Sequence, residues 1–180
     1  ATATQTTFNI FKGEVPEMTV DASTDASVPV TYQWYLSSNL NTVICSQSTY
    51  APTNVTTATN YTCVISDTYN TETINFTVNV SDSVFTDNTL DKVLTVAKGA
   101  SVNLVTDVTS NTGDVTYQWQ SKSGSSYSNI SGETAKSYAF QANGSGSYRC
   151  VVSDKFGNTY NVDFEVTVPT LKLGTNVTEI

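Results

Sequence analysis

The sequence predicts an all-β protein that consists of two β-sandwich domains in tandem. Two observations carry this prediction: the chain repeats one pattern twice, and within each copy apolar residues alternate with polar ones. No stretch holds an apolar stripe at helical spacing, and the enrichment in Thr and Val favours strands. A length of 180 residues suits two small domains.

The duplication is visible in segments that recur in the second half with little change. The matching pairs are Val30–Trp34 with Val115–Trp119, Tyr61–Asp67 with Tyr148–Asp154, and Phe76–Val80 with Phe164–Val168. We therefore expect a first domain over residues 1–81 and a second over 82–169. The tail 170–180 begins Thr-Leu-Lys-Leu-Gly and is predicted to open the first strand of a further domain.

Short strands separated by turns account for each copy. Residues 74–80, 101–104 and 162–168 alternate apolar and polar side chains. A period of two is typical of a strand with one face in a core and the other in water. Turn signals such as Lys98-Gly99 and Asn143-Gly144 separate these runs. Several short strands at this spacing predict a sandwich of two antiparallel sheets.

A Trp and a Tyr-x-Cys motif in each copy narrow the prediction to an immunoglobulin-like sandwich. Such domains bury a Trp on strand C and place a Tyr two residues before a Cys on strand F. The expected core positions are Trp34, Tyr61 and Cys63 in the first domain, and Trp119, Tyr148 and Cys150 in the second.

Strand B departs from the usual pattern, because it has no cysteine to pair with the one on strand F. Met18, Val20 and Ala22 occupy this region of the first domain, and Leu104 and Thr106 that of the second. The inter-sheet disulfide is therefore absent. We expect Cys63 and Cys150 to be buried as small apolar side chains.

These motifs resemble the repeated immunoglobulin-like modules of bacterial surface and secreted proteins, above all those of Gram-positive gut bacteria. The resemblance rests on Tyr-Gln-Trp, an Ile-Ser-Gly turn, Tyr-x-Cys-Val-Val-Ser-Asp and a final Val-x-Phe-x-Val-x-Val. It covers residues 6–80 and 91–168. It implies an extracellular chain, secreted or held at the cell surface.

The resemblance leaves the function open, because such modules serve as adhesins, glycan binders and inert spacers alike. We expect a non-enzymatic binding or adhesion segment of a larger bacterial surface protein, which recognises a glycan or a host protein such as immunoglobulin. The alternative is a passive spacer that presents neighbouring catalytic or binding domains of the same polypeptide.

The composition excludes several kinds of chemistry. Without histidine, the chain lacks the base of Ser–His–Asp and Cys–His catalysis, and three cysteines are too few for a structural zinc site. A net charge of -8 disfavours a nucleic-acid partner. No apolar run approaches the roughly 20 residues that cross a bilayer. We therefore expect no enzymatic activity, no cofactor and no membrane insertion.

Four aromatic residues are candidate binding residues. Tyr69 and Phe156 lie at equivalent tips of the last hairpin in each domain, and the corresponding antibody loop dominates recognition. The alternative is that both rings fold back and cap the sandwich. Tyr35 and Tyr127 are further candidate surface aromatics.

The sequence leaves two structural features undecided, a disulfide bond and a calcium site. Cys45 and Cys63 would form a disulfide if strand packing brings their Cα atoms within roughly 7 Å; otherwise Cys45 is a free thiol on a loop. Asp82, Asp87 and Asp91 lie near the joint between domains, where calcium would stiffen a tandem array. The alternative is that these carboxylates are solvated.

Overall fold

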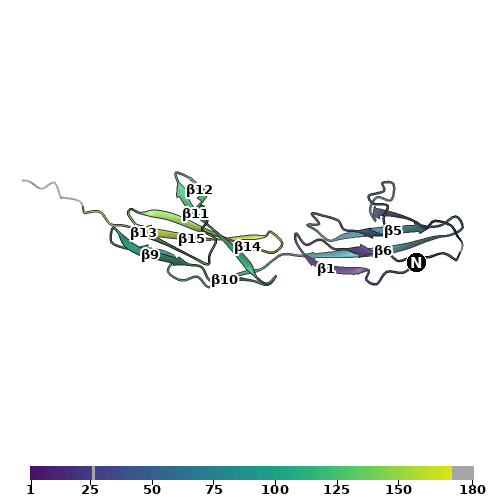
Figure 1. Ribbon diagram of the computed structural model, residues 1–180, viewed down its shortest axis with the longest axis horizontal. Helices are drawn as coiled ribbons and strands as arrows, with labels where there is room; N and C mark the ends of the chain where they lie inside the picture. The colour runs from purple at the N-terminus through teal and green to yellow at the C-terminus, as the bar shows by residue number, and fades with distance from the viewer. Residues whose placement is uncertain (26, 172–180) are drawn as a thin grey trace, which may run out of the picture. The chain divides into compact units, whose positions relative to one another are not determined.

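A computed structural model describes residues 1–25 and 27–171 of the chain (Figure 1). The chain divides into two compact units, domain 1 (Ala1–Ser83) and domain 2 (Val84–Ile180). The described residues form strands, turns and loops, which confirms the all-β prediction. Among them, no helix has the length and apolar character of a membrane span. The predicted strand of a further domain lies within residues 170–180, of which 172–180 fall outside the described part.

Domain 1 is built from two sheets. Its described part contains β1 (Thr7–Phe11), β2 (Met18–Thr19), β3 (Thr31–Leu36), β4 (Thr49–Tyr50), β5 (Thr59–Ser66) and β6 (Thr71–Ser81). The larger sheet has the order β1-β6-β5-β3, and the smaller one pairs β2 with β4. β1 runs parallel to β6, whereas the other pairs are antiparallel.

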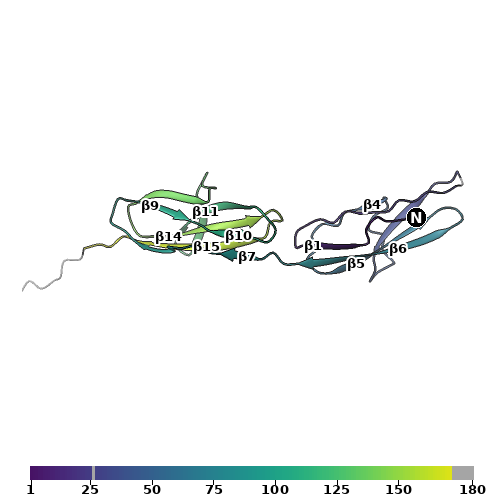
Figure 2. The ribbon, with the colours of Figure 1, turned by 90° about the horizontal axis from the view of Figure 1, so that it is seen from below.

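Domain 2 repeats this plan with additional short strands. Its described part contains β7 (Phe85–Asp87), β8 (Val93–Thr95), β9 (Ala100–Val105), β10 (Val108–Ser110), β11 (Val115–Ser123), β12 (Ser126–Asn129), β13 (Ser137–Ala142), β14 (Gly146–Asp154) and β15 (Thr159–Thr167). One sheet has the order β12-β11-β14-β15-β8, with β8 parallel to β15. The opposite layer pairs β13 with β9 and β10 with β7. Figure 2 labels β9, β10 and β7 of this layer.

This strand order is that of an immunoglobulin-like sandwich, so the predicted fold class is confirmed. In each domain the Trp strand and the Cys strand are antiparallel neighbours, with Trp34 opposite Cys63 and Trp119 opposite Cys150. The last strand of each domain also pairs in parallel with a short strand near its beginning.

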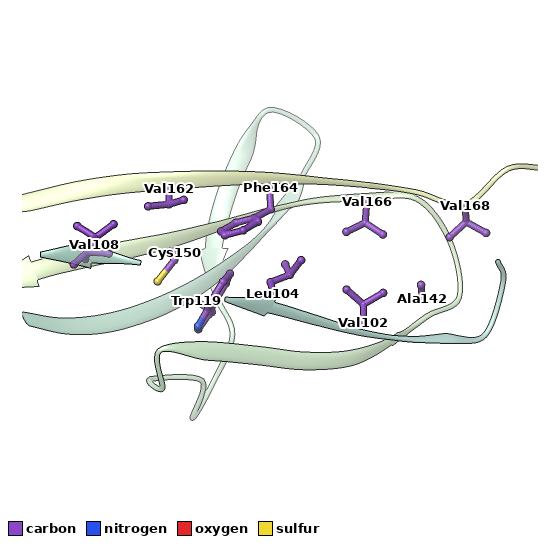
Figure 3. Packing of buried hydrophobic residues seen from close by; sticks show 11 residues of the cluster. Val102, Leu104, Val108, Trp119, Ala142, Cys150, Val162, Phe164, Val166 and Val168 are labelled. Atoms are coloured by element: carbon purple, nitrogen blue, oxygen red, sulfur yellow. The ribbon is translucent and has the colours of Figure 1, made fainter. Parts of the chain in front are cut away.

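A buried Trp occupies the centre of each core. Trp34 and Trp119 are 0% exposed, and each indole N–H donates to a backbone carbonyl, that of Gln47 (2.8 Å) or Ala135 (2.9 Å). Figure 3 shows Trp119 between the two layers, close to Cys150, Leu104 and Phe164. The indole thus fills the core while its one polar group keeps a partner.

Five of the six predicted core positions are buried, and Tyr148 is the exception. Tyr61, Cys63 and Cys150 are buried with the two Trp residues, but Tyr148 is only half-buried. A Cβ at Gly146 would lie 3.1 Å from the Tyr148 hydroxyl, so the ring lies across this glycine. It packs there against Phe140, with ring centroids 4.6 Å apart.

Cys63 and Cys150 are small buried side chains, as predicted. Both are 0% exposed. Burial raises the pKa of each thiol to about 11. Both cysteines are therefore protonated and weakly nucleophilic at neutral pH.

The disulfide between Cys45 and Cys63 is not formed, and that interpretation is wrong. The two residues pair with opposite sides of Trp34 in β3. Their backbones are therefore two strand spacings apart, about 9–10 Å, beyond the reach of a disulfide. The Cys45 thiol instead lies 3.7 Å from the carbonyl oxygen of Thr49, to which it donates.

Candidate functional site

The tip of the β5–β6 hairpin presents an aromatic side chain to solvent. Tyr69 is 73% exposed, so it does not cap the sandwich. Asp67 holds the turn, because its Oδ1 accepts the backbone N–H groups of Tyr69 (2.7 Å) and Asn70 (2.6 Å). These bonds keep the pKa of Asp67 below its ordinary value. A hollow of about 290 Å³ beside the hairpin is lined by Asp25 and Val30, among others.

The equivalent hairpin of domain 2, β14–β15, covers its aromatic residue. Phe156 is half-buried, and the Lys155 ammonium lies 4.9 Å from its ring centroid. Asp154 is buried and accepts the N–H groups of Phe156 and Asn158, each at 2.9 Å. The two hairpins share the Asp-held turn but differ in how far the aromatic side chain reaches solvent.

The outer face of the β1-β6-β5-β3 sheet is formed by uncharged residues. We call it the uncharged face: Asn9, Gln33, Tyr35, Asn60, Thr62, Val64, Thr73, Asn75, Thr77 and Asn79. Side-chain hydrogen bonds connect its strands, as between Thr62 and Asn75 (3.0 Å) and between Asn79 and Asn9 (2.9 Å). Tyr35 lies half-buried on this face, and its hydroxyl donates to Gln33 (3.2 Å).

A projecting segment next to this face exposes aliphatic side chains. We call residues 36–44 the apolar loop; it leaves β3 and stands away from the body of domain 1 (Figure 1). Leu40 is 57% exposed, and its large apolar neighbours are exposed too: Leu36, Val43 and Ile44. The loop is ordered by its own turn, in which the Asn39 N–H donates to the Leu36 carbonyl (2.8 Å).

The corresponding region of domain 2 is charged. Arg149 forms two hydrogen bonds with the Asp163 carboxylate, at 2.6 and 2.9 Å, which hold the pKa of that carboxyl below its ordinary value. The guanidinium also lies 4.1 Å from the ring centroid of Tyr127, and the Lys122 ammonium lies 5.6 Å from the same centroid. Tyr127 is therefore covered by cations, unlike Tyr69.

The apolar loop was missed by sequence reasoning, although a signal for it exists. No Asp, Glu, Lys or Arg occurs between Asp25 and Asp67, whereas Lys122, Glu133, Lys136 and Arg149 lie in the matching part of the second copy. The two copies thus differ in charge over matching surfaces, although they share one fold.

The predicted calcium ligands do not form a site. Within residues 1–25 and 27–171, no three Asp, Glu, Cys or His side chains gather to hold a metal. Asp87 is engaged otherwise: its Oδ2 accepts the Lys92 ammonium at 2.7 Å and the Tyr160 hydroxyl at 3.3 Å. An ammonium in this position occupies the carboxylate that calcium would need.

Domain 2 will lose stability in acid as Asp87 becomes protonated. Burial raises the pKa of Asp87, but hydrogen bonds from Lys92 and Thr89 outweigh it and lower the pKa from 3.8 to about 2. Because the pKa is lower in the folded state than in the unfolded state, the ionised carboxylate stabilises the fold by about 2 kcal/mol at any pH above the unfolded pKa. This stabilisation is lost as the pH falls from about 4 to about 2.

The measurement is the free energy of unfolding of the full chain between neutral pH and pH 2, for wild type and Asp87→Asn. The wild type should be the more stable at neutral pH, and the difference should shrink below about pH 4. A difference that stays constant across this range would show that Asp87 does not carry the acid sensitivity.

Neither a protein-family model nor a curated protein matches the chain. Among solved structures, the chain is similar to three N-terminal domains of the bacteriophage RB49 highly immunogenic outer capsid protein, at 14% identity and a TM-score of 0.42, covering 94% of this chain and 69% of that one.

Two further solved structures are similar. Drosophila OTK extracellular domains 3–5 are 18% identical with a TM-score of 0.42, over 91% of this chain and 60% of that one. Fibronectin(III)-like modules of Clostridium thermocellum CbhA are 13% identical with a TM-score of 0.41, over 93% of both chains. At these identities and TM-scores the similarity assigns no function and no ligand to this chain.

Proposed function

We propose that the chain is a non-enzymatic, extracellular binding segment of a larger bacterial surface protein, and that it recognises a host protein through domain 1. The observation that carries this proposal is the apolar loop, whose aliphatic side chains are exposed beside the uncharged face. Clustered exposed apolar side chains on a soluble domain mark sites of interaction.

The chemistry of this surface suits a protein partner. Cores of protein–protein interfaces are depleted in charge and enriched in aromatic residues. The uncharged face has the first property, and Tyr35 supplies an aromatic side chain next to the apolar loop. Burying Leu40 and Val43 against a partner would remove apolar area from water at no cost in desolvated charge.

A glycan target would call for a different surface. Sugars stack on aromatic rings that are open on one side, and the apolar loop offers branched aliphatic chains instead. Tyr69 is the candidate for such stacking, since it is the more exposed of the two hairpin aromatics. The two targets therefore predict different sensitive residues: Leu40 for a protein and Tyr69 for a glycan.

The test is a binding screen of the full chain against host immunoglobulins, mucins and plant polysaccharides. We expect saturable binding to a protein, weakened at least about tenfold by Leu40→Asp and several-fold by Tyr35→Ala. Gln120→Ala, at the position of domain 2 that matches Tyr35, is the control and should change nothing. Thermal melts must show that every variant remains folded.

Other outcomes would redirect or reject the proposal. Binding that is lost with Tyr69→Ala but survives Leu40→Asp would move the contact to the hairpin. Binding to polysaccharide alone would make the chain a glycan binder. If the chain binds no member of the panel, the passive spacer is favoured.

A further inference from the structure

One edge of the smaller layer in domain 2 is left without a neighbouring strand. β9 pairs with β13 on one side only. The Thr106 N–H donates toward β13, to Lys136 O at 3.1 Å, whereas Asp107 bonds in the opposite direction, accepting the Asn88 N–H at 2.8 Å. Since successive residues of a strand alternate direction, the backbone groups of Ser101, Asn103 and Val105 point away from β13.

The edge is open because the first strand of the domain changes layers. β7 runs antiparallel to β10, and continuing its course would carry it alongside β9. Instead the chain turns at Asp91, whose φ is 49°, and β8 joins β15 in the opposite sheet. Among the described residues, no backbone group forms a hydrogen bond with Ser101, Asn103 or Val105 across this edge.

A groove follows the open edge. It has a volume of about 400 Å³ and runs between the crossover residues Leu90 and Asp91 and the strand residues Asn103 and Val105. Leu90 is 78% exposed and Val105 is 45% exposed, so two apolar side chains flank it. Open strand edges of this kind are templates for pairing with another chain.

The charges around the groove favour a basic ligand. Asp107 is paired with Lys136 at 3.1 Å, which leaves the Asp91 carboxylate as the net charge of the rim. The chain as a whole has a net charge of -8. A basic residue in the ligand would therefore be attracted to the groove, and an acidic one repelled.

We propose that this groove binds an extended peptide segment of another protein. The peptide adds to β9 as an antiparallel strand, along the line that β7 would follow if it continued beside β9. Backbone hydrogen bonds to Ser101, Asn103 and Val105 would hold the peptide. One apolar side chain of the peptide lies between Leu90 and Val105, and a Lys or Arg lies beside Asp91. This site is independent of the apolar loop of domain 1.

Amide hydrogen exchange of the full chain, followed residue by residue, tests the proposal. In the free protein, the amides of Val102 and Leu104 should exchange slowly and those of Ser101, Asn103 and Val105 quickly. Adding the peptide acetyl-Lys-Thr-Val-Thr-Val-Lys-amide should slow the latter three at least about tenfold and leave the former two unchanged.

Altered peptides and two protein variants separate strand addition from other binding. Two further peptides carry N-methyl groups at alternate residues, one at the odd positions and the other at the even positions. One of them should no longer protect β9 and the other should still do so, because only one set of peptide N–H groups faces β9. Asp91→Asn should weaken binding about threefold, and the loss should vanish in high salt. Leu90→Ser, at a solvent-exposed position, should weaken it without lowering the melting temperature.

Three results would overturn the proposal. The first is no protection at any peptide concentration. The second is protection at residues outside the groove. The third is protection without peptide that grows with protein concentration, because the edge would then be covered by a second copy of the chain.

Discussion

Replacing Trp34 or Trp119 by Ala will lower the free energy of unfolding of its own domain by about 3–5 kcal/mol. Each indole is fully buried and packs against a Phe of the last strand, with ring centroids 5.0 Å apart for Phe76 and 5.3 Å for Phe164. Truncation leaves a cavity and removes the indole N–H that donates to the carbonyl of Gln47 or Ala135. Small domains are stable by only about 5–15 kcal/mol, so the loss is a large part of the whole.

The chain supplies its own control for this experiment, because each domain contains one of its two Trp residues. In Trp34→Ala the remaining fluorescence reports domain 2, whose denaturant midpoint should not move, and the reverse holds for Trp119→Ala. Far-ultraviolet circular dichroism or amide exchange follows the mutated domain. Trp→Phe at the same positions should cost less, since most of the ring volume is kept. An unchanged stability of the mutated domain would contradict the core assignment.

The core could be predicted from sequence because its pattern is local. Alternation along residues 162–168 places Val162, Phe164 and Val166 on one face, whatever the rest of the chain does. The Trp and Tyr-x-Cys spacings then fix which strands are neighbours. The absence of a cysteine on strand B also suffices to predict that Cys63 and Cys150 carry no inter-sheet bond.

The surface could not be predicted in the same way, because it depends on how loops bend. Tyr69 and Phe156 hold equivalent positions in the sequence, yet one is exposed and the other is half-buried under Lys155. The distance between Cys45 and Cys63 depends on which side of β3 each residue pairs with, and sequence separation does not contain this. The open edge of β9 likewise follows from the turn at Asp91.

The turn residues Asp67 and Asp154 belong to the same motif but lie in different environments. Both accept backbone N–H groups of the hairpin that follows. Asp67 performs this role at the surface, whereas Asp154 is 6% exposed and also accepts the Thr112 hydroxyl at 3.2 Å. The shared Ser-Asp sequence predicts the turn in both hairpins but not the burial of the second.

Asp154→Ala will therefore destabilise domain 2 by about 2–4 kcal/mol, because it removes a buried carboxylate that accepts the N–H groups of Phe156 and Asn158 and the Thr112 hydroxyl. Asp154→Asn keeps the shape and one acceptor oxygen, so it should cost less. Amide hydrogen exchange of the full chain, which follows each domain separately, measures both losses.

Asp67→Ala is the matched control, since it removes the same turn contacts in domain 1. Its effect on stability should be clearly smaller, because Asp67 is less buried than Asp154 and water can satisfy the freed N–H groups. Equal losses at the two positions would mean that the turn itself, and not burial, determines the cost. A larger loss at Asp154 would show that the burial of this turn residue, and not the turn alone, makes it a structural requirement of domain 2.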